Sequence, residues 1–257
     1  EYSCRERITL TAGARYNHDG VAGEEVSPSF GLVWRLFDRT SLRAVAAHGF
    51  RSPQINELYM FPPSNEDLEA ERVWNYEMGL RQKIPGGLEM DISVYRMDGE
   101  NMIELADNPS PPPMMRFANT GDFVFDGMEV SLDGNWRGGF SGNVSWTKLD
   151  PGRWTKGRPG TKIDFGLSQH AKRYKVRLSG RYIDDYYAGN DSTDPIPSYM
   201  VIDIYGEAIV TGGVSVFAGL NNIGDEEYSI YTDLPGGQAG LYLMPGRTVT
   251  AGLKYGY

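Results

Sequence analysis

The chain closes with Thr250-Ala-Gly-Leu-Lys-Tyr-Gly-Tyr257, a stretch that alternates in polarity and ends on an aromatic ring. Successive side chains of a β-strand point to opposite faces, so Val249, Ala251 and Leu253 share one face with Tyr255 and Tyr257. A strand whose apolar face meets lipid accommodates such a terminal ring at the membrane interface. The stretch therefore predicts a final β-strand with one apolar face and one polar face.

The same two-residue alternation recurs along the whole chain. It marks about a dozen segments, most of them close to the ~9–11 residues that a tilted membrane-spanning strand needs. These segments are residues 8–16, 29–37, 41–50, 73–81, 88–95, 128–133, 140–147, 162–168, 174–182, 200–207, 214–220 and 249–257. The pattern predicts an all-β protein without any long helix.

The connections between these segments differ systematically in length. Short turns are expected at 38–40, 85–87, 137–139, 171–173 and 211–213. Long loops are expected at 17–28, 51–71, 98–120, 148–160, 185–198 and 225–246. Short turns at one end and long loops at the other are typical of outer-membrane barrels.

Composition excludes several classes of protein. The chain has 257 residues with 34 acidic and 25 basic side chains, so its net charge of -9 argues against a nucleic-acid partner. No run approaches the ~18–20 apolar residues of a membrane helix. Cys4 is the only cysteine, which excludes an internal disulfide. No signal peptide precedes Glu1, so we expect the N-terminus to be processed or truncated.

Alternation alone does not distinguish a membrane barrel from a soluble sandwich. Three features favour the barrel: aromatic residues at the ends of the apolar sets, charges mixed with glycine on the polar sets, and a spacing of about twenty residues between strands. The aromatic set is Trp34, Trp74, Trp146, Tyr174, Tyr182, Tyr255 and Tyr257. We predict an antiparallel transmembrane β-barrel of about 12 strands, with short inner turns and long outer loops.

One motif follows the third alternating segment. It comprises Gly49, Phe50, Arg51, Ser52, Pro53, Ile55, Glu57, Leu58 and Tyr59. Physically, Pro53 forces the preceding residue into an extended conformation and ends the ladder as the strand leaves the sheet. For this fragment alone, an ordinary exit from a strand into a loop is the alternative explanation.

The motif resembles the loop entry of TonB-dependent receptors, and further matches follow in the order of that family. They are Leu68-Glu-Ala-Glu71, Tyr76-Glu-x-Gly79, Tyr95 with Asp98, Asn101 and Ile103, Asn119-x-Gly121, Gly127-x-Glu129, Asn221-Asn-Ile223 with Asp225 and Tyr228, and Pro245-Gly-Arg247. Ala70 stands where the family usually has proline. Thr250, Gly252, Tyr255 and Tyr257 resemble the C-terminal assembly signal of outer-membrane barrels. The resemblance spans about residues 8–257.

The resemblance implies a location in the bacterial outer membrane and uptake of a scarce large nutrient, such as an iron chelate (siderophore) or cobalamin. The family barrel has twenty-two strands around an N-terminal plug, so residues 1–257 are expected to be its C-terminal part, without a plug domain in this chain. The implied partners are outer-membrane lipid, the barrel-assembly machinery and a small-molecule metal chelate. A TonB-type energy-coupling complex is implied only if the full-length protein has a plug.

Candidate ligand-binding residues are aromatic and polar side chains of the outward loops. They are Arg51, Asn56, Tyr59, Phe61, Trp154, Arg158, Tyr186, Tyr187, Tyr228 and Tyr231. Rings and cations of this kind suit an anionic aromatic chelate. We expect no catalytic or metal site, because His18, His48 and His170 lie on unrelated segments and Ser168 with His170 lacks an orienting partner. We also expect no cofactor.

Three functions remain open at this point. The chain is part of a transport receptor, or a plugless pore that passes solutes by diffusion, or a soluble β-protein with an interaction role. Fractionation with the membrane, single-channel conductance and release into the aqueous fraction distinguish them.

Overall fold

The structure, a computed structural model, describes residues 2–4, 7–20, 23–60, 63–233 and 239–255. Phe61 and Tyr257, both named above, lie outside the described residues. The strands are β1 Tyr2–Cys4, β2 Ile8–Asp19, β3 Gly23–Phe37, β4 Thr40–Arg51, β5 Glu71–Ile84, β6 Leu88–Glu100, β7 Ile103–Asp107, β8 Met115–Asn119, β9 Phe123–Trp136, β10 Phe140–Asp150, β11 Thr161–His170, β12 Tyr174–Asp184, β13 Tyr186–Tyr187, β14 Pro195–Ile196, β15 Tyr199–Thr211, β16 Val214–Asn221, β17 Ser229–Asp233, β18 Ala239–Leu243 and β19 Thr248–Tyr255. One short helix, α1, spans Ile55–Leu58.

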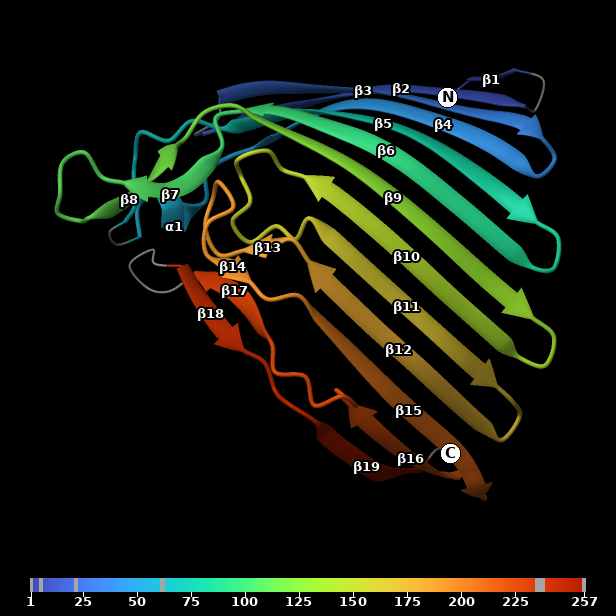
Figure 1. Cartoon of the computed structure of the whole chain (residues 1–257). Coiled ribbons are helices and arrows are strands. Elements are labelled where there is room, and N and C mark those ends of the chain that lie inside the picture. Colours follow the sequence, from blue (N-terminus) through green and yellow to red (C-terminus); the bar gives the residue numbers. More distant parts are fainter. Residues whose placement is uncertain (1, 5–6, 21–22, 61–62, 234–238, 256–257) are drawn as a thin grey trace.

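A single curved antiparallel sheet forms the wall (Figure 1). Its strand order is β1-β2-β3-β4-β5-β6-β9-β10-β11-β12-β15-β16-β19, so each strand pairs with its neighbour in sequence once the small hairpins are set aside. Those hairpins, β7–β8, β13–β14 and β17–β18, are inserted at one end of the wall together with α1. This up-and-down order is that of a barrel wall.

The twelve predicted strands are confirmed as β2, β3, β4, β5, β6, β9, β10, β11, β12, β15, β16 and β19, and the predicted fold class is confirmed with them. Several extend beyond the predicted segment: β2 continues to Asp19 and β3 begins at Gly23. The hairpins inside the expected loops 98–120, 185–198 and 225–246 were not predicted, because their strands are only two to five residues long.

Backbone hydrogen bonds join several of the short turns to the neighbouring hairpin. The amide of Lys83 donates to the carbonyl of Arg39, that of Asn135 to Gly87, and that of His170 to Gly139. Gly87 and Gly139 both have positive φ, and a Cβ on Gly139 would lie 1.9 Å from the His170 oxygen. Only glycine fits such a position. We call this end of the wall the turn end.

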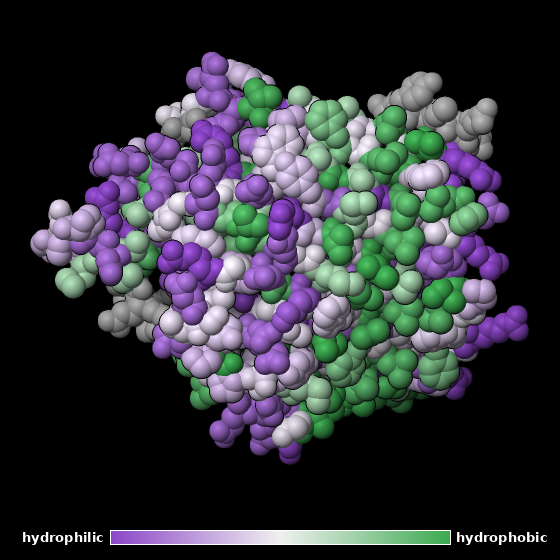
Figure 2. All heavy atoms as spheres, turned by 45° about the horizontal axis from the view of Figure 1, so that its top comes forward, coloured by the Kyte–Doolittle hydropathy of each residue, from purple (hydrophilic) through white to green (hydrophobic). Residues whose placement is uncertain are grey.

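The apolar side chains of the wall are exposed, because the sheet is a single layer with nothing packed against that face. Phe30 is 57 % exposed, Met78 66 % and Val249 75 %. Phe30 and Met78 share a face by register, since Phe30 is opposite Ala46, Ala46 is opposite Tyr76, and Met78 is two residues beyond Tyr76 on β5. Figure 2 shows the resulting hydrophobic band between a large hydrophilic region on one side and a narrower one on the other. Such a band is expected of a surface that meets hydrocarbon.

The opposite face carries ion pairs that bridge neighbouring strands. Arg43 on β4 lies 2.7 Å from Glu77 and 2.8 Å from Asp91, and Arg81 lies 2.9 Å from Asp91. Gly79 leaves room for the Arg43 guanidinium, since a Cβ there would be 2.4 Å from its Cζ. This inner face therefore holds charge in pairs, as a wet lumen requires.

Most of the buried apolar residues gather in three small clusters at the loop-side ends of the wall strands. One contains Leu58, Leu68 and Ile103; a second contains Met102, Phe123 and Trp154; a third contains Ile183, Tyr186, Ala188, Ile196 and Tyr199. We call this capped end the loop end. The residues described contain no helix long and apolar enough to span a membrane.

The final strand shows why glycine interrupts its pattern. Gly252 lies opposite Phe217 on β16, and a Cβ at Gly252 would come within 2.5 Å of that ring. Phe217, the apolar exception on its polar face, instead stacks on Tyr205 with ring centroids 6.2 Å apart. Tyr255 is 63 % exposed on the apolar face, as predicted for a residue at the membrane interface.

Candidate ligand-binding surface at the loop end

Arg51, at the end of β4, links three segments of the loop end. Its guanidinium donates to both carboxylate oxygens of Glu71, at 2.7 and 3.0 Å, and to Glu57 on α1 at 3.0 Å. Glu71 also accepts the backbone amide of Ile103 at 2.6 Å. Both carboxylates are largely buried, so their charges depend on Arg51 for compensation. The motif therefore fixes the strand exit through an ion cluster.

Helix α1 presents two of the candidate ligand residues to solvent. Its first turn is closed by the Gln54 amide, which donates to the Glu57 carboxylate at 2.6 Å. Leu58 is buried against Leu68, and this contact turns the opposite side of the helix outward. Asn56 is exposed, and Tyr59 is 59 % exposed just after the helix.

Glu104 on β7 connects the β7–β8 hairpin to two other loops. One carboxylate oxygen lies 3.3 Å from Arg158, and the other accepts a hydrogen bond from Asn190 at 2.9 Å. Thr155 completes the link, since its hydroxyl donates to the Gly189 carbonyl at 2.9 Å and accepts the Ser192 amide at 2.8 Å. The loops 98–120, 148–160 and 185–198 are thereby held as one unit.

Trp154 is buried in this unit. It is 7 % exposed, packs with Met102 and Phe123, and donates its indole N–H to the Asp122 carbonyl at 3.3 Å. The ring therefore anchors its loop onto the end of β9.

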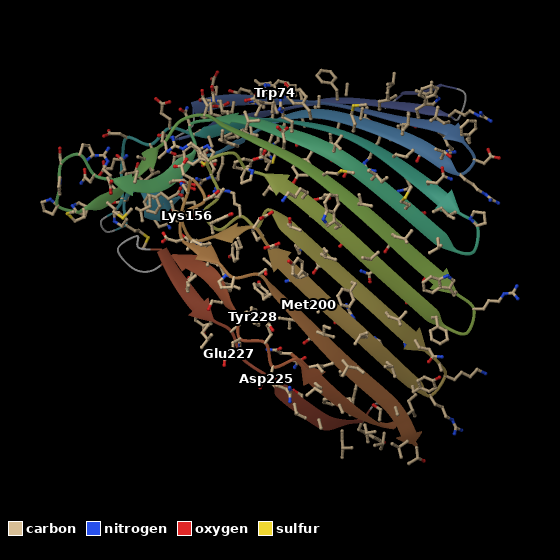
Figure 3. The ribbon with its side chains drawn as sticks, viewed as in Figure 1. Trp74, Lys156, Met200, Asp225, Glu227 and Tyr228 are labelled. Carbon is tan, nitrogen blue, oxygen red and sulfur yellow. The ribbon has the colours of Figure 1, made fainter. Side chains whose placement is uncertain are left out.

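Tyrosines make up part of the third cluster and pack against it: Tyr186 and Tyr199 belong to the cluster, and Tyr228 and Tyr231 lie against it. Tyr199 and Tyr228 lie with ring centroids 4.4 Å apart, and the Tyr186 hydroxyl accepts the Tyr231 amide at 2.9 Å. Lys156 lies over the Tyr231 ring at 5.6 Å and forms a β-bridge to Tyr187. In Figure 3, Lys156 lies among the loop-end hairpins, and Tyr228 lies before β17.

A hollow of about 480 Å³ opens beneath this group, between the wall and the segment that carries β17 and β18. The wall contributes charged side chains, including Asp164, Arg177, Arg181 and Asp203. The covering segment contributes Tyr228, Ile230 and Met244. Charge on one side and apolar surface on the other suit a large amphipathic solute.

Two other motif residues, Asn119 and Asn222, hold loop segments together through side-chain hydrogen bonds. Asn119 donates to the carbonyls of Glu69 and Asn101 and accepts the Glu69 amide. Asn222, with φ of 51°, donates to the carbonyls of Glu226 and Pro245 and accepts the Glu226 amide. Where the chain leaves the sheet, these asparagine side chains supply the backbone hydrogen bonds that the strand ladder no longer makes.

Asp185 lies just beyond β12. The Lys148 ammonium donates a hydrogen bond to its carboxylate, and this contact, together with the attraction between the two charges, lowers the pKa of Asp185 below its ordinary value. Both side chains are about half exposed, so solvent screens the pair.

The predicted ligand-binding residues fall into two groups, those that contact other protein groups and those that are exposed to solvent. Arg51, Trp154 and Arg158 are engaged with protein partners, whereas Asn56 and Tyr59 face solvent and Tyr187 and Tyr231 are partly exposed. Local sequence patterns do not indicate Glu104, Asn190 or Thr155 as loop connectors, since their partners lie 34 to 86 residues away. Among the residues described, no group of three or more His, Cys, Asp or Glu could hold a metal ion.

Comparison with known proteins identifies a family. A family model described as TonB dependent receptor-like, β-barrel matches residues 1–223. The ferric enterobactin receptor of Pseudomonas aeruginosa is 22% identical, over 93% of this chain and 39% of that receptor. The vitamin B12 transporter BtuB of Photobacterium profundum is 24% identical, over 83% of this chain and 37% of that transporter.

Solved structures show the same fold. A crystal structure of the ferric enterobactin receptor PfeA aligns with a TM-score of 0.75 at 20% identity, covering 98% of this chain and 43% of that one. The copper transporter OprC aligns with a TM-score of 0.75 at 17% identity, covering 98% and 45%. The chain thus spans about two fifths of the length of the relatives it matches.

Proposed function

This chain belongs to the TonB-dependent receptor β-barrel family, and on that premise we propose that it forms the C-terminal part of the barrel of an outer-membrane receptor. The receptor takes up a scarce large nutrient of the iron-chelate or cobalamin class. One observation carries the proposal: a single-layer wall exposes its apolar face, pairs charges on its inner face and is capped by folded loops at one end only.

In this proposal the loop end captures the ligand and the residues divide into two roles. Asn56, Tyr59, Tyr187 and Tyr231 supply partly or fully exposed polar and aromatic contacts. Arg51, Trp154 and Arg158 belong to the same site but act by holding the loops in place. The hollow beneath Tyr228 is lined by charged side chains of the inner face of the wall, including Asp164 and Arg181.

The names of the relatives support this ligand class, since they include ferric enterobactin, vitamin B12 and ferric citrate. In full-length form, we propose coupling to a TonB-type complex, insertion by the barrel-assembly machinery and contact with outer-membrane lipid.

The test uses the complete reading frame that contains this chain. Its deletion should abolish uptake of one radiolabelled iron chelate or of cobalamin, and a proton uncoupler should block the uptake in the complemented strain. The protein should fractionate with urea-washed outer membranes and shift on a gel when heated. Unchanged uptake of every tested ligand, with a protein that stays in the membrane, contradicts the receptor role.

A plugless diffusion pore is the second candidate, favoured by the charged inner face, which is compatible with a water-filled lumen. Planar-bilayer recordings separate the two: a pore gives stepwise conductance without ligand or energy, whereas a plugged receptor is silent.

A further inference from the structure

Two neighbouring hairpins at the turn end carry a patch of cations and aromatic rings. The β9–β10 turn contains Arg137 between Trp136 and Phe140, and the β11–β12 turn contains Lys172 and Arg173 followed by Tyr174. The hairpins lie side by side, since Phe140 is opposite Gln169 and the His170 amide donates to the Gly139 carbonyl (Figure 1). We call these six residues the turn patch.

The rings of the turn patch lie on the apolar face of the wall. Trp136 is opposite Phe140, and each is about two-fifths exposed, as is Tyr174. The Trp136 ring lies over Gly134, where a Cβ would come within 2.3 Å of it, so the ring is held along the sheet. Exposed aromatic rings at the edge of an apolar band mark the level of the lipid headgroups.

The three cations of the turn patch are exposed and have no ion-pair partner in the described part of the chain. Neither turn contains an acidic residue, and Asp133, the nearest acid along β9, lies on the inner face with Glu129. By contrast, Arg51, Arg158 and Lys148 at the loop end are all paired with carboxylates.

The sequence shows that this contrast is general. The five short turns contain four basic residues and one acidic residue. The six segments expected as long loops, which include the loop-end parts of several strands, contain 20 of the 34 acidic residues and 6 of the 25 basic ones. Unpaired cations beside interfacial rings attract anionic lipid phosphates, at about 1 kcal/mol for each Lys or Arg near the surface.

We propose that the turn patch is a docking site for the phosphate headgroup of an anionic phospholipid in the periplasmic leaflet of the outer membrane. Arg137, Lys172 and Arg173 contact the phosphate oxygens, and Trp136, Phe140 and Tyr174 lie against the glycerol and the upper acyl chains. The proposal rests on the proposed outer-membrane placement, with short turns toward the periplasm.

The test is native mass spectrometry of the full-length receptor in detergent, titrated with phosphatidylglycerol or phosphatidylcholine. The variant R137Q/K172Q/R173Q should weaken phosphatidylglycerol binding by roughly a hundredfold, at about fivefold for each of the three cations. Phosphatidylcholine binding should not change. The charge-conserving variant R137K/K172R/R173K should keep the wild-type affinity, which separates loss of charge from loss of fold.

The matched control is K175Q/R177Q/K254Q, which removes three cations from the inner face near the same end of the wall. Its affinity for phosphatidylglycerol should stay within about twofold of that of the wild type, because charge on the inner face does not meet the leaflet. The proposal is overturned if both glutamine variants lose the same affinity for phosphatidylglycerol, or if R137Q/K172Q/R173Q loses none. Complete displacement of the lipid by excess inorganic phosphate also overturns it. The proposed placement fails separately, if the protein is absent from outer-membrane fractions.

Discussion

The loop end and the turn end of the wall are stabilised in different ways. At the loop end, side chains connect distant segments: Arg51 links β4, α1 and β5, and Glu104 links three loops. At the turn end, backbone hydrogen bonds connect adjacent hairpins, and the three cations of the turn patch have no ion-pair partner among the described residues. The comparison teaches that substitution of polar side chains should damage the loop end, whereas only backbone-altering changes should damage the turn end.

The largest effect is expected from Gly139→Ala at the turn end. A Cβ there lies 1.9 Å from the His170 carbonyl oxygen and φ is 76°, so the backbone must shift and lose a hydrogen bond. We expect a loss of about 2–4 kcal/mol of unfolding free energy, measured by urea unfolding in lipid vesicles.

Gly138→Ala is the matched control for that change. Gly138 also has positive φ, but its nearest neighbour is the Phe140 ring at 3.6 Å, so the cost should be only about 1 kcal/mol. Equal losses of unfolding free energy in the two variants would show that the close approach of Gly139 to the His170 carbonyl is unimportant.

The second effect is expected from Arg51→Met at the loop end. Glu57 and Glu71 would lose their shared cation while largely buried. A fully buried pair costs about 3–5 kcal/mol to break, and the partial exposure of Arg51 reduces the expected loss to about 2 kcal/mol. Hydrogen exchange should rise at α1 and β7 but not in the turn at 137–139.

Arg116→Met on β8 is the control, because Arg116 has no ion-pair partner among the described residues. If Arg51→Met leaves exchange at β7 unchanged, Arg51 does not organise the loop end.

A smaller effect is expected from Glu104→Ala. The variant leaves Arg158 and Asn190 without their common acceptor, which should cost about 1–2 kcal/mol. Limited proteolysis should then cut the loop at 185–198 faster. Glu66→Ala removes an exposed acid at the same end and should not change the cleavage rate. Equal rates for both variants would contradict the proposed link between loops.

The smallest effect is a pH dependence at Asp185. Lys148 lowers the pKa of Asp185 in the folded protein, so the pair stabilises the fold above the unfolded-state pKa of about 4. That stabilisation is lost as the pH falls through the lower, folded pKa. An NMR titration of the Asp185 carboxyl should give a depressed midpoint, which returns to the ordinary value in Lys148→Met. An ordinary midpoint in the wild type would exclude the interaction.

The strands of the wall were predicted well because each one can be recognised from the alternation of its own residues. Alternation at 88–95 locates β6, and the Gly-Gly pairs at 86–87 and 138–139 locate two turns without any knowledge of neighbours. The motif around Pro53 likewise marked the exit of β4 correctly, where the strand ends at Arg51.

The loop end was harder to predict because its contacts are distant in sequence. Glu104 and Asn190 are 86 residues apart, and nothing in either local pattern indicates the other. Trp154 was predicted as a ligand residue from its type, whereas its burial against Met102 and Phe123 depends on how three loops fold together. Whether it also influences ligand capture stays a prediction.

The central claim is that the apolar face of the wall meets lipid and the charged face meets the lumen. The most direct measurement is spin-label scanning along β6 in vesicles, in a Cys4→Ser background because Cys4 is the only cysteine of this chain. Labels at Leu88, Met90, Ile92 and Val94 should be accessible to oxygen, and labels at Glu89, Asp91 and Ser93 to a water-soluble nickel reagent. A reversed pattern, or no alternation between neighbouring positions, would contradict the account.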